Sequence, residues 1–312
     1  MVNFWSKLPK PFLVLAPLAG ATDSAFRQIC KDFGAQVVVS EMASVAALAH
    51  DQRKTLSMLA FEEKERPYVV QLFGANPEQF ALAAQIITEK IKPDGLDINF
   101  GCPVPKVIKQ GAGAALGSDL EKSRAVVEAV LANTNLPVSI KLRALNKEIT
   151  AEQFVANLAD LPIAAVAIHG RSLSAGFSGP ADPKAIAACR AYVAGNLIAN
   201  GGIEDLASAE AMLKDSQADG LMIGRAALSR PWLFKEILAK KTIDLTWSEL
   251  TTLMRRHAEL VVASKGEHGL LEFRRFLAWY VKGWPQAKNI RQQLVTVEKL
   301  ADLEKIISSD AT

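Results

Sequence analysis

The sequence repeats one unit eight times: a short, nearly continuous apolar run, followed by a stretch with helical spacing. The eight runs, most of them rich in β-branched or aliphatic residues, are 12–16, 36–40, 68–73, 95–99, 138–143, 165–169, 197–200 and 220–223. Strands that are apolar along their whole length are typical of a parallel sheet buried on both faces. Start signals for helices stand between the runs, at Asp23, Asn76, Asp119 and Asp205.

Eight such units within about 250 residues match the size of a (β/α)8 barrel, the TIM barrel. The alternative is an open, doubly wound sheet, which usually has fewer units and a GxGxxG fingerprint after its first strand. Residues 16–20 follow the first run and lack that fingerprint. The sequence therefore predicts an α/β fold in which residues 1–243 form a TIM barrel.

Residues 244–312, which we call the tail, have helical periodicity and no strand signals, and predict a smaller helical domain. A capping-box pattern of Thr246 with Glu249 indicates where its first helix begins. Trp279, Tyr280 and Trp284 are interleaved with basic residues. These basic residues are Arg255, Arg256, Lys265, Arg274, Arg275, Lys282, Lys288 and Arg291. They form either a solvated face over an aromatic core or a surface for RNA phosphates, and their pattern alone favours neither.

Composition excludes several classes of protein. Of 312 residues, 50% are hydrophobic and 22% are charged, a balance typical of globular chains, and the net charge of +3 indicates no global nucleic-acid signal. Cys30, Cys102 and Cys189 are too widely spaced for a zinc site or a disulfide framework. The apolar run at 12–19 is too short to cross a bilayer. We therefore expect a cytoplasmic protein with no metal and no membrane segment.

Polar residues stand at the carboxyl ends of nearly all the runs, where TIM barrels carry their catalytic groups. They are Glu41, Gln71, Asn99, Lys141, Arg143, His169, Arg171, Asn200 and Arg225. Taken singly, Lys141 could be a Schiff-base lysine or an ion-pair partner, and His169 could be a satisfied core histidine. Together with Gln71 they suit a flat polar heterocycle, such as the N1–C2=O edge of a reduced flavin.

Two of these strand ends predict a phosphate site. Asn200, Gly201 and Gly202 follow the seventh run, and Gly224 with Arg225 follows the eighth. Glycines let backbone N–H groups approach phosphate oxygens, and TIM barrels often bind phosphate in these two loops. The alternative is that the glycines only form tight turns. It is less consistent with the finding that both loops match the phosphate-binding pattern.

Cys102 begins a glycine-rich stretch that ends at Ala115, and its length and composition predict a mobile lid over the barrel mouth. The thiol could be a nucleophile, a general acid or an inert small group. With an ordinary pKa of about 8.5 it would hold its proton at neutral pH, as an acid must. Cys30 and Cys189 lie in helical patterns and are expected to pack in the core.

The motifs at the strand ends occur together and in a fixed order. They span 16–23, 40–42, 70–74, 97–103, 111–116, 140–143, 168–171, 199–202 and 222–225. In this order they resemble the tRNA-dihydrouridine synthase family, most of all its bacterial B-type branch. The tail is similar to the C-terminal domain of that family through Arg274, Arg275, Phe276, Trp279 and Tyr280.

The resemblance implies an FMN enzyme that reduces the C5–C6 double bond of particular uridines in tRNA, with NADPH as the electron source. It implies that Cys102 is the general acid that protonates C5, while hydride passes from flavin N5 to C6, and that Asn99 hydrogen-bonds the uracil. The residues that it implies for FMN binding are Ala16, Pro17, Leu18, Gln71, Lys141, His169, Asn200, Gly201, Gly202, Gly224 and Arg225.

A stacked uracil cannot reach the floor of a barrel, so the uridine must be flipped out. The tail, through Arg274 and Arg275, is then expected to bind the tRNA backbone, so that 1–243 is the FMN-binding catalytic domain and 244–312 the tRNA-binding domain. We expect a monomer. NADH remains an alternative to NADPH.

Two positions depart from the family pattern. Leu18 replaces a methionine, and 144–147 replaces Thr-Gly-Trp, which predicts a shortened fifth loop with altered substrate contacts. Two rival functions also stay open: an FMN barrel that acts on a free pyrimidine, like the dihydroorotate dehydrogenases, and a tRNA-binding protein without activity.

Overall fold

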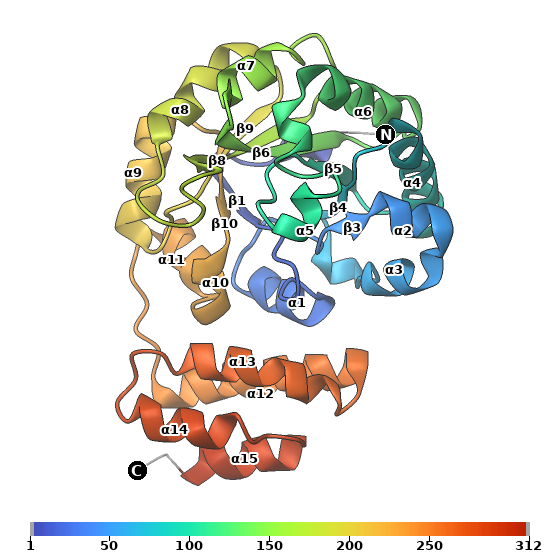
Figure 1. Cartoon of the computed structure of the whole chain (residues 1–312). Helices are drawn as coiled ribbons and strands as arrows, with labels where there is room; N and C mark the ends of the chain where they lie inside the picture. The colour runs from blue at the N-terminus through green and yellow to red at the C-terminus, as the bar shows by residue number, and fades with distance from the viewer. Residues whose placement is uncertain (1–2, 310–312) are drawn as a thin grey trace.

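The computed structural model describes residues 3–309, so the ends of both predicted domains, 1–2 and 310–312, lie outside the described residues. It contains a closed barrel of eight parallel strands surrounded by helices (Figure 1). In order around the ring the strands are β1 (Phe12–Leu15), β2 (Val37–Val39), β4 (Tyr68–Phe73), β5 (Gly95–Asn99), β6 (Val138–Asn146), β8 (Ala165–Ser172), β9 (Asn196–Asn200) and β10 (Gly220–Ile223). β1 pairs with both β2 and β10, which closes the ring. The predicted TIM barrel is confirmed, and each apolar run forms one of its strands.

Two short strands lie outside the ring. β3 (Ala43–Ser44) pairs with β4, and β7 (Ile149–Thr150) pairs antiparallel with the end of β6. At the predicted shortened loop after Arg143, β6 continues through a bulge to Asn146 and turns back into β7, and α7 begins at Ala151. The turn places Lys147 at a φ of 52°, and the Asn146 side chain donates to the Phe100 carbonyl oxygen at 2.8 Å, which holds the hairpin against β5.

Helices cover the outside of the barrel. They are α1 (Ser24–Asp32), α2 (Val45–His50), α3 (Gln52–Met58), α4 (Pro77–Lys90), α5 (Pro105–Ile108), α6 (Leu120–Ala132), α7 (Ala151–Ala156), α8 (Pro183–Ala187), α9 (Leu206–Ser216), α10 (Arg225–Ser229) and α11 (Leu233–Ala239), with 3-10 turns η1 (Phe4–Lys7), η2 (Glu63–Glu65), η3 (Leu116–Ser118) and η4 (Ala188–Tyr192). Asp23, Asn76, Asp119 and Asp205 each cap a helix by accepting a backbone N–H, as predicted. Among residues 3–309 no helix is both long and apolar enough to cross a membrane.

The apolar core is divided by the barrel wall. Phe12, Val14 and Val39 belong to a cluster inside the barrel, whereas a larger cluster lies between the strands and the surrounding helices. Trp5 packs on Phe12 and accepts, through its carbonyl oxygen, a hydrogen bond from Asn196, so it closes the end where the strands begin. The polar residues at the strand carboxyl ends are therefore left at the opposite, open end.

The tail consists of helices α12 (Trp247–Lys265), α13 (Gly269–Tyr280), α14 (Ala287–Leu294) and α15 (Leu300–Ser309), which lie beside the barrel below α1 and α10 (Figure 1). The predicted capping box of Thr246 and Glu249 opens α12. Helix α12 contacts α1, and α13 contacts α10. At this joint the His257 ring packs among Phe26, Phe273 and Phe276, so the larger apolar cluster continues from the barrel into the tail.

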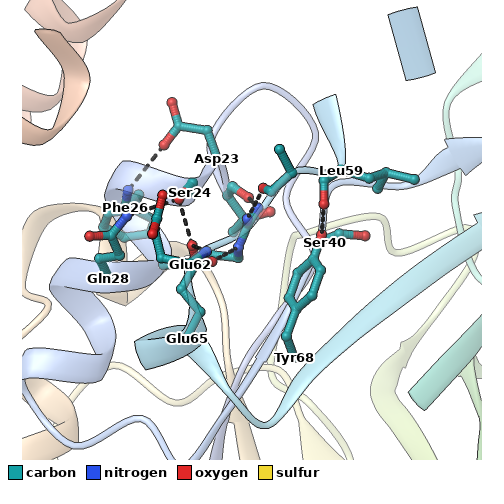
Figure 2. A network of polar contacts seen from close by, with 12 residues as sticks. Asp23, Ser24, Phe26, Gln28, Ser40, Leu59, Glu62, Glu65 and Tyr68 are labelled. Carbon is teal, nitrogen blue, oxygen red and sulfur yellow. Dashed lines mark hydrogen bonds and ion pairs between the residues drawn. The ribbon is translucent and has the colours of Figure 1, made fainter. Parts of the chain in front are cut away.

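Helix α1, which packs against α12 of the tail, is fixed by a buried polar network (Figure 2). Arg27 forms a fully buried ion pair with Glu65, with 2.5 Å between Nε and Oε2, and its other nitrogens donate to carbonyl oxygens of Thr22 and Ala60. Ser24 donates to the second Glu65 oxygen. Because all these buried groups have partners, the network holds α1 rigidly against the barrel.

Candidate active site

The carboxyl ends of the strands surround a cleft, and it contains most of the residues that the sequence singled out. Its lining includes Ala16, Pro17, Leu18, Gln71, Asn99, Cys102, Lys141, His169, Asn200, Gly201, Gly202, Gly224 and Arg225. Arg274 and Arg275 lie outside it, in the tail, and Glu41 also lies outside, where it accepts a hydrogen bond from the Gly20 N–H. The structure thus brings together residues from six or more strands that are far apart in sequence.

Four cationic side chains and one carboxylate, that of Glu204, line the cleft, and within residues 3–309 none of the four cations forms an ion pair. Lys141 donates to the Asn200 amide oxygen at 3.0 Å, and Arg143 donates to the carbonyl oxygens of Gly101, Ser172 and Gly176. Arg171 donates to the Gly179 carbonyl oxygen, and Arg225 lies over the Phe177 ring. Positive charge that these neighbours do not neutralise makes the cleft attractive to an anion.

His169 lies in the middle of these cations. Burial, together with the charges of Lys141, Arg143, Arg171 and Arg225, lowers its pKa to about 2, so the ring is neutral at physiological pH. Its Nδ1 accepts the backbone N–H of Arg171 at 3.3 Å, which places the proton of the neutral ring on Nε2. His169 is therefore a neutral hydrogen-bond donor at this site, not a cation.

One end of the cleft has the features of an oxyanion cradle. Gly201 and Gly202 adopt φ values of +100° and +73°, and a Cβ at Gly201 would lie 3.2 Å from the His169 ring, so this turn needs glycine. Nη1 of Arg171 is buried and has no hydrogen-bond partner among the described residues. An unpaired guanidinium nitrogen beside a close-approach glycine turn fits a phosphate oxygen.

Cys102 and Lys141 have perturbed proton affinities. Burial raises the pKa of the Cys102 thiol, so the group holds its proton at neutral pH. Burial lowers the pKa of the Lys141 ammonium to about 8, close enough to neutrality for a bound anion to decide its charge. The pair provides a proton donor and a charge-compensating cation in one cleft.

The stretch after Cys102, which the sequence predicts to be a mobile lid, is partly exposed and partly packed at the mouth of the barrel. It contains α5 and η3, and Val107, Ala112 and Ala114 are buried. The Ala114 N–H donates to the Cys102 carbonyl oxygen, and Gly113, at φ +60°, packs so closely that a Cβ would lie 2.9 Å from the Cys102 Cβ. Small residues let this segment pack down on Cys102 and hold it.

The tail uses several of its basic residues for its own packing. Arg255 pairs with Glu304, and Lys265 pairs with Asp23 of α1. Arg274 donates to the Val297 carbonyl oxygen at 2.8 Å and lies 3.4 Å from Glu298, so its guanidinium ties α13 to the segment before α15. Arg275 donates to the Gly20 carbonyl oxygen, next to the cleft loop that follows β1. Lys282, Lys288 and Arg291 are exposed.

Several lining residues were missed by the sequence reasoning, among them Phe177, Ile203 and Glu204. Asp97 was missed as well, although an acidic residue inside an apolar strand is a usable signal. It is 2% exposed and accepts hydrogen bonds from Gln71 and Ser139 beneath the cleft. Burial raises the pKa of its carboxyl group.

Comparison with known proteins shows similarity over most of the chain. The family model described as dihydrouridine synthase matches residues 14–312. A probable tRNA-dihydrouridine synthase of Aquifex aeolicus is 32% identical over 95% of this chain and 94% of that protein, and tRNA-dihydrouridine synthase B of Pseudomonas aeruginosa is 34% identical over 90% and 87%.

Solved structures share the fold at low identity. Morphinone reductase in complex with tetrahydroNAD aligns with a TM-score of 0.52 and 14% identity over 74% of this chain and 87% of that one. A 2-naphthoyl-CoA reductase aligns with a TM-score of 0.56 and 11% identity over 73% and 50%. These likenesses show the barrel alone. The family match, which covers nearly the whole chain, shows more: this chain belongs to the dihydrouridine synthase family.

Proposed function

We propose that this protein is an FMN-dependent tRNA-dihydrouridine synthase that uses NADPH. The observation that carries the proposal is the cleft itself, where a thiol that keeps its proton lies among unneutralised cations at the mouth of a barrel. The curated relatives, which are named for this activity, support the same conclusion.

The residues of the cleft fit FMN. Gly201, Gly202, Arg171 and Arg225 would hold the phosphate, because the cradle combines a close-approach turn with an unpaired buried Nη1. Lys141 and His169 would face the ring, together with Gln71 and the loop that carries Ala16, Pro17, Leu18, Asn200 and Gly224. When bound, FMN supplies the hydride that reduces C6 of the uracil.

The chain supplies orientation and one proton. Cys102 holds the proton for C5, and its raised pKa keeps it protonated until the carbon becomes basic. Asn99 presents its Nδ2 toward the Sδ of Met42 at 3.9 Å, and we propose that uracil replaces this weak contact. Lys141 compensates the negative charge that accumulates on the reduced ring.

A second cleft leads from the barrel mouth to the tail, and we propose that it carries the tRNA backbone. It shares Glu204, Arg225 and Ala226 with the first cleft and reaches Lys282 and Trp284. Aromatic and basic side chains in one groove suit a single-stranded segment with a flipped base. Outside this cleft, Arg275 of α13 lies against Gly20 of the loop after β1, and we propose that Arg275 contacts RNA while Arg274 shapes the tail. We also propose that the protein acts in the cytoplasm, where tRNA is present, and that it is a monomer.

The test is mass mapping of dihydrouridine in tRNA from cells that lack this gene. Each reduced uridine is heavier by two hydrogens, so loss at a defined position names both reaction and target. If the map is unchanged and the purified protein reduces free uridine as efficiently as tRNA, the proposal that tRNA is the substrate is contradicted. A colourless protein that takes up no FMN contradicts the enzyme and favours a binding protein. Parallel assays with NADPH and NADH identify the reductant.

A further inference from the structure

A chain of hydrogen bonds runs along the floor of the cleft and ends on the backbone of Cys102. Gln71 Nε2 donates to Asp97 Oδ2 at 2.7 Å, and Asn99 Nδ2 donates to Gln71 Oε1 at 2.8 Å. Asn99 Oδ1 then accepts the backbone N–H groups of Gly101 and Cys102 at 3.0 and 2.9 Å. Asp97 and Gln71 are at most 2% exposed, so little water reaches the hydrogen bond between them, whereas Asn99 is 8% exposed at the cleft surface.

The chain can run in one direction only, and its two ends decide which. A carboxylate accepts hydrogen bonds and cannot donate, so Gln71 must turn its NH2 group toward Asp97. A backbone N–H can only donate, so Asn99 must turn its oxygen toward Gly101 and Cys102. Both requirements agree, since the Gln71 oxygen then meets the Asn99 NH2 group.

A buried aspartate at position 97 stabilises the fold less than an apolar side chain would, so stability alone does not explain it. It stands on the inner face of β5, and a buried carboxyl group that forms no close ion pair opposes folding, even with the charge of Lys141 nearby. Its two oxygens accept from Gln71 and from Ser139 Oγ, at 2.7 and 2.6 Å, and no ion pair to it exists within residues 3–309. The Ser139 bond satisfies the other oxygen and plays no part in the direction of the chain.

We propose that Asp97 is a positioning residue that acts through Gln71 and Asn99 to orient both amides and to place the Cys102 backbone. Without an acceptor at Asp97, the Gln71 NH2 group loses its partner and the Gln71 amide can turn away, so Asn99 loses the acceptor that holds its side chain over the N–H groups of Gly101 and Cys102. The inference rests on the proposed function, because it concerns the placement of the proposed acid.

The experiment compares three variants of the full chain. Asp97→Asn keeps an oxygen that can accept from Gln71, Asp97→Leu removes every acceptor, and Ser139→Ala removes only the hydrogen bond outside the chain. The first readout is the rate at which iodoacetamide alkylates Cys102 in the FMN-free protein, followed by peptide mass, since Cys30 and Cys189 are fully buried. The second readout is kcat and KM for tRNA reduction.

We expect iodoacetamide to alkylate Cys102 about tenfold faster in Asp97→Leu than in the parent. We also expect kcat for tRNA reduction to fall about tenfold at unchanged KM, which is the effect of one misplaced buried hydrogen bond. Asp97→Asn and Ser139→Ala are expected to behave like the parent in both assays. A role in stability alone would lower the unfolding temperature without changing the alkylation rate of the folded protein.

If Cys102 in Asp97→Leu is alkylated at the same rate as in the parent, the proposal is overturned. An Asp97→Asn variant as impaired as Asp97→Leu also overturns it, because charge rather than direction would then matter. If Asp97→Leu does not fold, Gln71→Met interrupts the same chain one link later and must give the same faster alkylation. Failure of the parent to reduce tRNA would contradict the proposed function and leave the alkylation result to decide this inference separately.

Discussion

At the scale of single residues, the cleft works through environments that shift ordinary side chains away from their usual behaviour. His169 is held neutral by burial and by neighbouring cations, while burial raises the pKa of the Cys102 thiol. Lys141 loses part of its charge because burial lowers its pKa. Each shift follows from placing a polar group on the rim of an apolar barrel.

Replacement of Cys102 by alanine should leave FMN binding intact and slow the reduction of tRNA by about 10²- to 10⁴-fold, the usual contribution of a positioned general acid. The measurement is single-turnover reduction of tRNA by the pre-reduced enzyme. Cys189→Ala is the matched control, because that thiol is buried away from the cleft. Unchanged turnover would remove Cys102 from the mechanism.

FMN affinity should fall as the pH rises from 7 to 9. Lys141 has a pKa of about 8 in the empty cleft, so it loses its positive charge across this range, whereas the FMN phosphate is already ionised. We expect a decrease of about tenfold, the lower end of what a hydrogen bond to a charged group contributes. Flavin fluorescence quenching measures it. Lys141→Met should bind more weakly with no such decrease, and a flat parental profile would contradict this role.

At the scale of elements, the tail separates its basic residues into two groups. Arg255, Lys265 and Arg274 hold helices together, whereas Lys282, Lys288 and Arg291 are exposed on and before α14. A half-buried guanidinium that caps carbonyl oxygens, such as that of Arg274, cannot also bind phosphates without loosening the fold, whereas the exposed Arg275 can. The RNA-facing charge of the tail is therefore expected in the second group.

Changing Lys282, Lys288 and Arg291 together to alanine should weaken tRNA binding and lower the slope of log affinity against log salt by about 2, because each lost phosphate contact removes part of that slope. Filter binding at several salt concentrations measures both quantities.

The control removes an equal charge elsewhere. Lys54, Lys122 and Lys214 are exposed on α3, α6 and α9, and their triple alanine variant should bind tRNA with the parental salt slope. If the two triple variants show equal slopes of log affinity against log salt, the tail charges form only a solvated face and do not bind tRNA.

At the scale of the whole molecule, barrel and tail share one apolar cluster, and a buried histidine lies at the joint. His257 Nδ1 contacts the Tyr280 hydroxyl at 2.8 Å, and burial lowers the pKa of His257 to about 3. The unfolded chain binds a proton to this residue near pH 6.5, and the folded chain does not. Its contribution to stability is therefore complete above pH 6.5 and is lost as the pH falls toward 3.

His257→Gln should make the protein less sensitive to acid. Glutamine can still contact Tyr280 but does not titrate, so the loss of unfolding free energy between pH 6.5 and 5 should be smaller by about 2 kcal/mol than in the parent. Guanidinium unfolding at the two pH values measures it. His268→Gln, at an exposed position, is the control and should follow the parent. Identical acid sensitivity in all three proteins would exclude His257 as the cause.

Much of the fold and most of the cleft could be predicted, because both depend on local pattern. Apolar runs separated by capped helices specify parallel strands, and parallel strands place their carboxyl ends at one edge of the barrel. Gln71, Asn99, Lys141, His169 and Asn200 therefore line one cleft, whatever the details of packing.

The tertiary structure alone decided how those residues are connected. The direction of the amides from Asp97 to Cys102, the inward turn of Arg274 and the extension of β6 past Arg143 all depend on partners distant in sequence. Hydrogen bonds and pKa shifts are set by distances of a few ångströms between such partners, and a periodic pattern contains no such distances. The sequence alone determined which groups meet at the barrel mouth, and the closure of the ring determined what each can donate, accept or hold.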